Sequence, residues 1–141
     1  GLSIGKVEGV EEEENAEYAF NPESIHFYVA VVSKRSQDLN RLSFNISNFN
    51  IENYDQDFFE VSSTPMNDDL MIFVVKNFET AKAGLDYFYA LLADPQVFSE
   101  FEERDFRHFV ISRENYSLFF KNKNVFKYIQ FFNENYKETD N

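Results

Sequence analysis

The stretch of sequence that decides the fold runs from residue 24 to residue 32 and reads Ser-Ile-His-Phe-Tyr-Val-Ala-Val-Val. It is rich in β-branched and aromatic residues, which favour extended strands. Successive residues of a strand point to opposite faces, and both faces of this stretch are largely apolar. A strand that is apolar on both faces is covered from both sides. We therefore expect residues 24–32 to form a central strand of a sheet.

Apolar spacing predicts the other elements. Helices are expected over residues 38–50 and 79–93, and strands over residues 58–63, 70–76 and 105–111. The two helices carry buried stripes that consist of Leu39, Leu42, Ile46 and Phe49, and of Ala81, Leu85, Phe88 and Leu92. The Asn-rich end of the first helix predicts fraying. Pro65 and the following Asn-Asp-Asp predict a turn, and Asp94-Pro95 predicts a short helix that ends near Phe101.

This order of elements, β-α-β-β-α-β, predicts an α+β fold. The usual arrangement is ferredoxin-like, with a four-stranded antiparallel sheet and two helices on one of its faces. The first and third strands would then be central. Ser112 is expected to cap a helix that begins at Arg113, and Asn122 or Asn124 begins a last helix. The buried stripe of that last helix is Val125, Tyr128, Ile129, Phe132 and Tyr136. We expect these extra C-terminal helices to cover the other face or an edge.

The charge of the chain divides its 141 residues into two regions. The net charge is -12, and residues 1–23 supply half of it with one Lys and seven Glu. Blocks of like charge bury nothing, so residues 1–23 are expected to form a disordered acidic linker before a single α+β domain at 24–138. The alternative is an acidic patch for a cation or a basic partner. A negative chain repels phosphates, which argues against nucleic acid and anionic membranes. No apolar run is long enough to span a membrane.

The residues that could carry chemistry do not form a catalytic pattern. There is no Cys, and the two histidines, His26 and His108, have no third ligand at a suitable spacing for a metal. We interpret both as partly buried residues of the sheet. The acidic groups Asp68-Asp69 and Glu102-Glu103-Asp105 indicate a turn and a solvated face. The sequence therefore predicts a non-enzymatic chain with no metal and no cofactor.

The last two helices carry more aromatic residues than one buried stripe needs. Tyr116, Phe119 and Phe120, together with Phe126 and Phe131-Phe132, are the candidates for contact with a partner. The alternative is that they cover the open face of the sheet, which a small domain needs for its core. We take Tyr116, Phe119 and Phe120 as the candidate interface.

Four segments carry a family resemblance. They are residues 39–50, which read Leu-Asn-Arg-Leu-Ser-Phe-Asn-Ile-Ser-Asn-Phe-Asn, and residues 75–78, 109–116 and 128–136. Together they resemble the C-terminal domain of Bacteroidetes tetratricopeptide-repeat lipoproteins, which include the PorW and SprE proteins of gliding motility and type IX secretion. The resemblance implies a protein–protein assembly module in the periplasm, associated with the outer membrane through a longer protein. Its expected partners are other envelope proteins. The chain holds no repeat array, so it is either an excised domain or a short relative.

The same layout also resembles the SPOR domain. That resemblance implies binding of cell-wall glycan strands through the open face of the sheet. The extra C-terminal helices are expected to cover much of that face, and likeness of fold alone does not establish function. Glycan binding is therefore the alternative to protein assembly.

Overall fold

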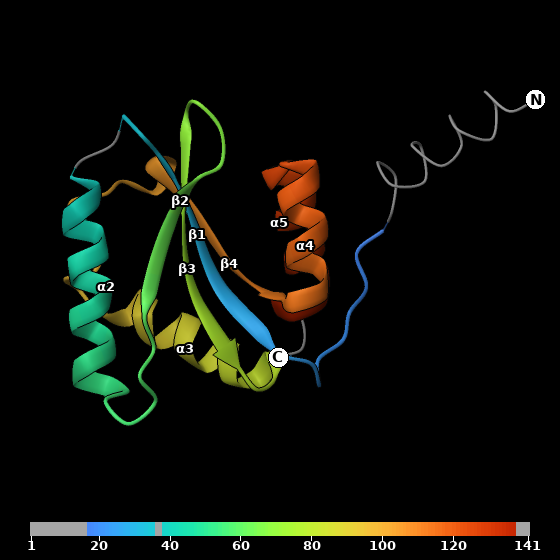
Figure 1. The fold of residues 1–141 in the computed structure, drawn as a ribbon, viewed down its shortest axis with the longest axis horizontal. Helices are drawn as coiled ribbons and strands as arrows, with labels where there is room; N and C mark the ends of the chain where they lie inside the picture. The colour runs from blue at the N-terminus through green and yellow to red at the C-terminus, as the bar shows by residue number, and fades with distance from the viewer. Residues whose placement is uncertain (1–16, 36–37, 138–141) are drawn as a thin grey trace, which may run out of the picture.

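The computed structural model describes residues 17–35 and 38–137. The strands are β1 (His26–Ser33), β2 (Val61–Pro65), β3 (Leu70–Phe78) and β4 (Phe106–Ser112). The helices are α2 (Leu39–Asn53), α3 (Ala81–Ala93), α4 (Arg113–Asn122) and α5 (Val125–Phe132), with a short 3₁₀ helix η1 (Glu103–Asp105) and a π-helical turn η2 (Asn133–Lys137). The chain is thus α+β, as predicted (Figure 1).

The four strands form one antiparallel sheet in the order β2-β3-β1-β4. The predicted central positions of β1 and β3 are confirmed. Tyr28 of β1 pairs with Val75 of β3 on one side and with Val110 of β4 on the other. Every residue of β1 from His26 to Val32 is buried, which explains why both faces of this strand are apolar.

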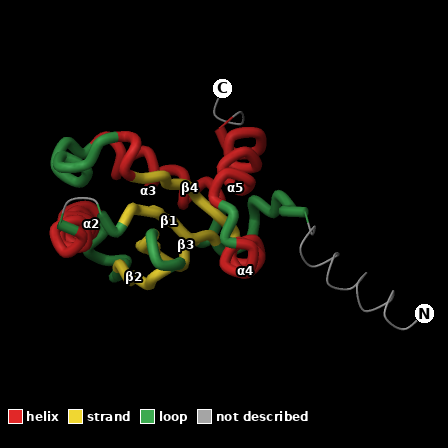
Figure 2. Tube along the Cα trace, turned by 90° about the horizontal axis from the view of Figure 1, so that it is seen from above, coloured by secondary structure: helices red, strands yellow, loops and turns green. Residues whose placement is uncertain are grey.

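Helices lie on both faces of the sheet (Figures 1 and 2). The ring of Tyr28 lies 5.4 Å from that of Tyr87 in α3, whereas the ring of Phe27 lies 5.3 Å from that of Tyr116 in α4. Neighbouring residues of β1 therefore face different helices. Phe132 of α5 lies 5.5 Å from Phe88 of α3, so the C-terminal helices also wrap around the β4 edge.

Helix α2 begins as predicted and ends later than predicted. Asp38 caps its start by accepting hydrogen bonds from the backbone of Asn40 and Arg41. The Asn-rich end does not fray, because Asn50 is buried and bonded. Its Oδ1 accepts a 2.6 Å hydrogen bond from the hydroxyl of Tyr87, and its Nδ2 donates to the carbonyl of Phe59. This tertiary contact overrides the poor helix propensity of Asn.

Strand β2 is displaced from its predicted position. Phe58 adopts φ 54°, outside the strand region, so the strand begins only at Val61. Pro65 ends this edge strand instead of lying in the turn, and no donor is lost because its nitrogen faces away from β3. The predicted turn follows, held by Asn67, whose Oδ1 accepts bonds from the backbone of Asp69 and Leu70.

Two predictions around α3 are wrong. Leu92 is 49% exposed, and Leu91 is buried in its place, because the buried face of α3 is broader than one stripe and includes Tyr87. No helix forms after Pro95; residues 95–100 form turns, and Asp94 accepts a hydrogen bond from the backbone of Gln96.

The packed part of the chain begins before residue 24. The run of four Glu at residues 11–14 lies outside the described residues. Within the segment 17–23, Tyr18 is only 8% exposed, and its ring lies 4.9 Å from that of Tyr128. The side chain of Asn115 donates to the carbonyl of Ala19 and accepts from its N–H. Residues 17–23 therefore belong to the domain, contrary to the predicted linker boundary.

Candidate interaction surfaces

The three predicted interface residues lie on α4, and they differ in exposure. Ser112 caps this helix as predicted, accepting from the backbone of Asn115. Phe119 is fully buried, with its ring 5.4 Å from that of Phe109, so it belongs to the core and cannot contact a partner. Tyr116 is half-buried, and Phe120 is 37% exposed. The predicted interface therefore reduces to Tyr116 and Phe120.

A more exposed aromatic residue lies at the start of α5. Phe126 is 72% exposed, on a helix whose buried side holds Tyr128 and Phe132. Beside it is a hollow of about 210 Å³ whose lining is mostly apolar. The hollow is lined by Val31, Ser33, Leu70, Arg104, Asp105, Phe106, Arg107, Val125 and Phe126. We call this hollow, together with Phe120, the α4–α5 surface.

The α4–α5 surface combines an apolar centre with cationic side chains. The ammonium group of Lys123 lies 5.9 Å from the ring centre of Phe120, within the range of a cation–π contact. The guanidinium of Arg107 donates to the carbonyls of Glu103 and Phe106, which fixes its position at the hollow. Such a surface can accept an apolar side chain that is flanked by acidic groups.

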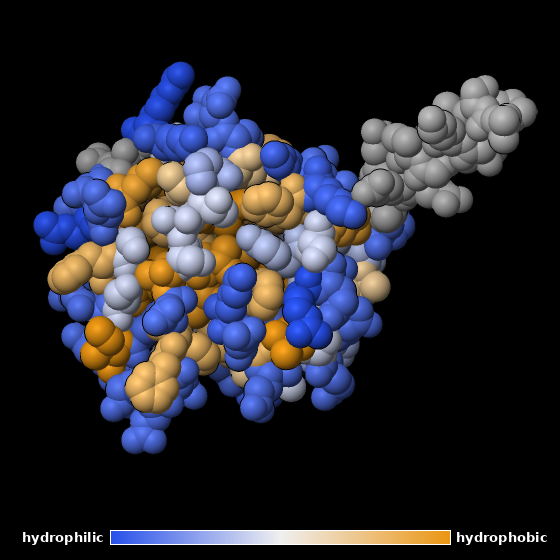
Figure 3. All heavy atoms as spheres, viewed as in Figure 1, coloured by the Kyte–Doolittle hydropathy of each residue, from blue (hydrophilic) through white to orange (hydrophobic). Residues whose placement is uncertain are grey.

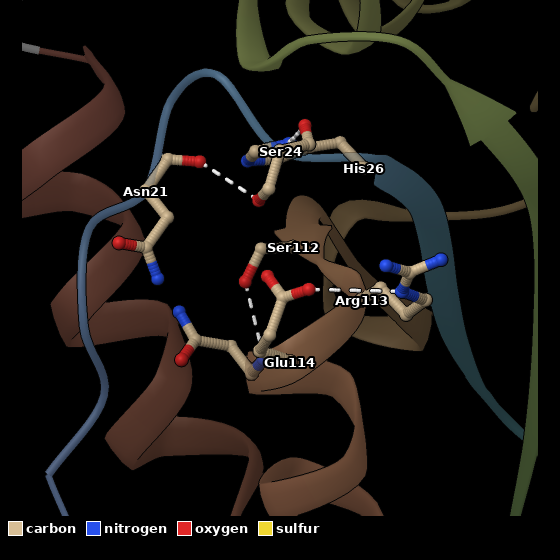
Figure 4. A network of polar contacts seen from close by, with 7 residues as sticks. Asn21, Ser24, His26, Ser112, Arg113 and Glu114 are labelled. Atoms are coloured by element: carbon tan, nitrogen blue, oxygen red, sulfur yellow. Dashed lines mark hydrogen bonds and ion pairs between the residues drawn. The ribbon is translucent and has the colours of Figure 1, made fainter.

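His26 is a buried part of the framework. Its Nδ1 lies 2.7 Å from the carbonyl of Ser24, an acceptor only, so Nδ1 carries the proton (Figure 4). Nε2 therefore accepts the 2.8 Å hydrogen bond from the hydroxyl of Tyr136. Burial lowers the pKa of His26 and raises that of Tyr136 to about 12, so both groups are neutral near pH 7. This pair links the start of β1 to the end of the chain.

Figure 4 shows the polar contacts that gather around this start of β1. The hydroxyl of Ser24 donates to the carbonyl of Asn21, and Arg113 forms an exposed ion pair with Glu114. An exposed pair of this kind contributes little to stability. The arrangement orders the turn before β1 and the start of α4.

The second histidine lies far from the first along the sheet. Strands β1 and β4 are neighbours, but His26 pairs with Ser112 whereas His108 pairs with Ala30. Nδ1 of His108 is 2.9 Å from the hydroxyl of Tyr28. Within residues 17–35 and 38–137, no group of three or more His, Asp or Glu side chains could hold a metal ion. Both histidines lie in strands of the sheet, as interpreted from the sequence, but only His108 is partly buried, whereas His26 is fully buried.

The acidic residues before β4 form a turn. The side chain of Asp105 accepts from the backbone of Glu102, and the carboxylate of Glu102 pairs with Arg104 at 2.7 Å. Glu102, Glu103 and Arg104 are exposed. Asp68 and Asp69 are exposed in the β2–β3 turn. These positions agree with the turn and solvated face expected from the sequence.

Three strongly exposed apolar residues escaped the sequence analysis. Phe44 is 57% exposed and Ile51 67% exposed on α2, and Phe58 is 85% exposed in the loop after it. The signal was available, because Phe44 and Ile51 lie seven residues apart and fall outside the buried stripe of their helix. Figure 3 also shows hydrophobic side chains at the surface over the sheet, between α2 and α4.

Comparisons with family models, with curated proteins and with solved structures found no match. None of the described helices is long and apolar enough to cross a membrane.

Proposed function

We propose that this chain is a non-enzymatic protein–protein interaction module whose partner docks on the α4–α5 surface. The observation that carries this proposal is the 72% exposure of Phe126 beside a mostly apolar hollow. A large aromatic residue next to an apolar hollow is typical of the energetic centre of a protein interface. The occupant is a segment of an envelope protein that inserts an apolar side chain and places acidic groups near Arg107 and Lys123.

The setting of this module follows from the family resemblance. We place it in the periplasm, associated with the outer membrane as part of a longer repeat lipoprotein of the Bacteroidetes, with a role in secretion or gliding. The strand order β2-β3-β1-β4, with a helix in each crossover, supports a ferredoxin-like assignment of its core. The extra helices α4 and α5 would then be the addition that provides the docking surface.

The experiment is a pull-down from a Bacteroidetes envelope extract with three baits. They are the unmodified chain, the variant Phe126→Asp, and the variant Phe44→Asp. The last is the matched control, because Phe44 is also an exposed Phe but lies on a different helix, α2. We expect specific envelope proteins to be captured by the unmodified chain and the control, and lost with Phe126→Asp. Equal capture by all three baits would overturn the proposed surface, and equal loss with both variants would show non-specific hydrophobic binding.

Glycan binding is kept as the second candidate function because part of the sheet side remains open between α2 and α4 (Figure 3). Exposed aromatic rings and small polar residues such as Ser62 and Ser63 of β2 suit a sugar chain. Sedimentation with purified cell-wall sacculi tests it directly. Co-sedimentation of the chain without capture of envelope proteins would replace the assembly function with glycan binding.

A further inference from the structure

The two edges of the sheet differ in how their backbone groups are satisfied. At the β4 edge, the hydroxyl of Tyr128 donates to the carbonyl of Val110 at 2.6 Å. The guanidinium of Arg107 donates to the carbonyl of Phe106 at 2.9 Å. Helix α5 and an Arg side chain thus occupy this edge. An occupied edge is one of the ways in which proteins prevent pairing with another chain.

The β2 edge is open. The backbone N–H of Met66 donates to the carbonyl of Leu70, next to the pair that Pro65 forms with Met71. This bond shows which residues of β2 direct their backbone groups toward β3. Ladder bonds alternate in an antiparallel pair, so the N–H and C=O groups of Val61 and Ser63 point away from β3. Among the described residues, no hydrogen bond reaches these outward groups. They are a template for one more strand.

An apolar side chain and a hollow lie where this edge begins. Phe58 is 85% exposed and has φ 54°, an unfavourable conformation for an aromatic residue. It lines a hollow of about 330 Å³ together with residues from the start of β2 and the end of β3. The remaining lining residues are Asp57, Phe59, Glu60, Ser62, Lys76 and Asn77. If a further strand were added beside β2, every second side chain of that strand would face this hollow.

The charge of this side of the molecule selects the occupant. Residues 42–75, which span most of α2, all of β2 and most of β3, contain no Lys or Arg. Among the described residues, Lys76 is the one cation that lines the hollow, and its ammonium group lies 5.5 Å from the ring centre of Phe27. Residues 42–75 contain six acidic residues, and each is exposed: Glu52, Asp55, Asp57, Glu60, Asp68 and Asp69. Within the part of the chain that the structure describes, none of the six forms an ion pair. A second copy would bring these carboxylates against each other, whereas a basic segment would neutralise them.

We infer that the β2 edge binds an extended, basic segment of a partner protein, in which Lys or Arg alternates with apolar residues. The segment adds a fifth strand by hydrogen bonding to the backbone of Val61 and Ser63. One of its apolar side chains contacts Phe58, and its cations face Asp57 and Glu60. This surface is separate from the α4–α5 surface, so the inference goes beyond the proposed function and does not depend on it.

The test uses the full chain and a fluorescent peptide of alternating Lys and Val, followed by anisotropy and by amide NMR. We expect saturable binding and shifts of the Val61 and Ser63 amide signals. Two versions of the peptide are N-methylated at alternate positions, at every Lys or at every Val. In an added strand, only every second residue points its N–H group toward β2. The version that is methylated at those residues loses its donors and should bind about tenfold or more weakly, while the other version keeps its affinity. Equal affinity of the two versions, or no binding at about 1 mM peptide, would overturn the inference.

Two charge variants test the electrostatic part. Asp57→Asn with Glu60→Gln removes two carboxylates beside the edge, and Glu100→Gln with Glu103→Gln removes two exposed carboxylates elsewhere. We expect the first pair to weaken peptide binding roughly three- to tenfold and the second pair to change it less than about twofold. Equal weakening by both pairs would reduce the binding to general charge attraction. Concentration-dependent dimerisation that the peptide prevents would identify a second copy as the occupant and would also overturn the inference.

Discussion

His26 shows how one buried residue makes the stability of the fold depend on pH. Burial disfavours its charged form and outweighs the carbonyl of Ser24 and the carboxylate of Glu114, which favour that form. Protonation would also remove the hydrogen bond that Nε2 accepts from Tyr136. The pKa of His26 in the folded chain is therefore below the ordinary value of 6.5, which applies to the unfolded chain. The unfolded state binds the proton first as the pH falls, so this contribution is complete above pH 6.5 and is lost below it.

We predict that His26→Gln reduces this acid sensitivity. Below about pH 6.5, the unmodified chain should lose unfolding free energy more steeply with falling pH than the variant does, because its unfolded state binds the proton more readily than its folded state. Urea unfolding followed by circular dichroism at several pH values measures the difference. Parallel pH profiles of the two proteins would show that His26 does not titrate differently in the folded and unfolded states.

Phe132 is the residue at which the packing of α5 against the sheet and α3 can be tested. It is 1% exposed and contacts rings of the sheet and of α3, at 6.4 Å from Phe109 and 5.5 Å from Phe88. Phe132→Ala should lower the unfolding free energy by roughly 3–5 kcal/mol, because it leaves a cavity. Leu92→Ala removes a side chain that is 49% exposed, and it should cost less than about 1 kcal/mol. Equal costs for the two variants would contradict the assignment of Phe132 to the core.

At the scale of elements, Gly84 sets how closely α3 approaches β4. A Cβ atom at this position would lie 2.7 Å from Cγ1 of Val110, closer than carbon atoms can pack. Gly inside a helix costs about 1 kcal/mol relative to Ala, so its presence here is explained by packing and not by propensity. β4 is therefore the strand that α3 approaches most closely at this point.

We predict that Gly84→Ala destabilises the chain by about 1–2 kcal/mol despite its better helix propensity, because the valine side chain is rigid and cannot move aside. The double variant Gly84→Ala with Val110→Ala removes the clash, and the alanine at residue 84 should then become neutral or stabilising. Thermal and urea unfolding of the four combinations measure this coupling. Additive effects would show that the helix shifts freely over the sheet.

For the whole molecule, the sequence predicts the sheet and its order better than it predicts the ends of elements and the surfaces. The apolar run at residues 24–32 and the helical stripes consist of buried positions. Buried positions recur with the period of a strand or a helix, so the pattern of apolar residues along the sequence reveals them. The extension of α2 depends on the hydrogen bonds of Asn50 with Phe59 and with Tyr87, and Tyr87 lies 37 residues further along the chain. Which backbone groups of β2 remain open depends on how β2 pairs with β3. Phe119 and Phe120 are the same residue type, and one is buried and the other exposed only because their side chains point in different directions. Pairwise geometry of this kind has no local signature.

The N-terminal segment is the clearest case in which distant parts of the chain are joined. Tyr18 packs on Tyr128 and Phe131 of α5, and Asn115 of α4 holds the backbone of Ala19 with two hydrogen bonds. The N–H of Ala81, at the start of α3, donates to the carbonyl of Pro22. A segment that was expected to be a linker thus connects three helices from both sides of the sheet.

We predict that a chain beginning at Asn21 is less stable than a chain beginning at Glu17 by about 1–3 kcal/mol. Burial of the tyrosine ring and two hydrogen bonds favour the longer chain, and the entropy of ordering a few residues offsets part of that gain. Asn115→Ala should cost more in the longer chain than in the shorter one, because only the longer chain has Ala19 as a partner. Urea unfolding of these four proteins gives the coupling energy between the segment and α4. A coupling near zero would mean that the segment lies on the helices without stabilising them, and the domain boundary would return to residue 24.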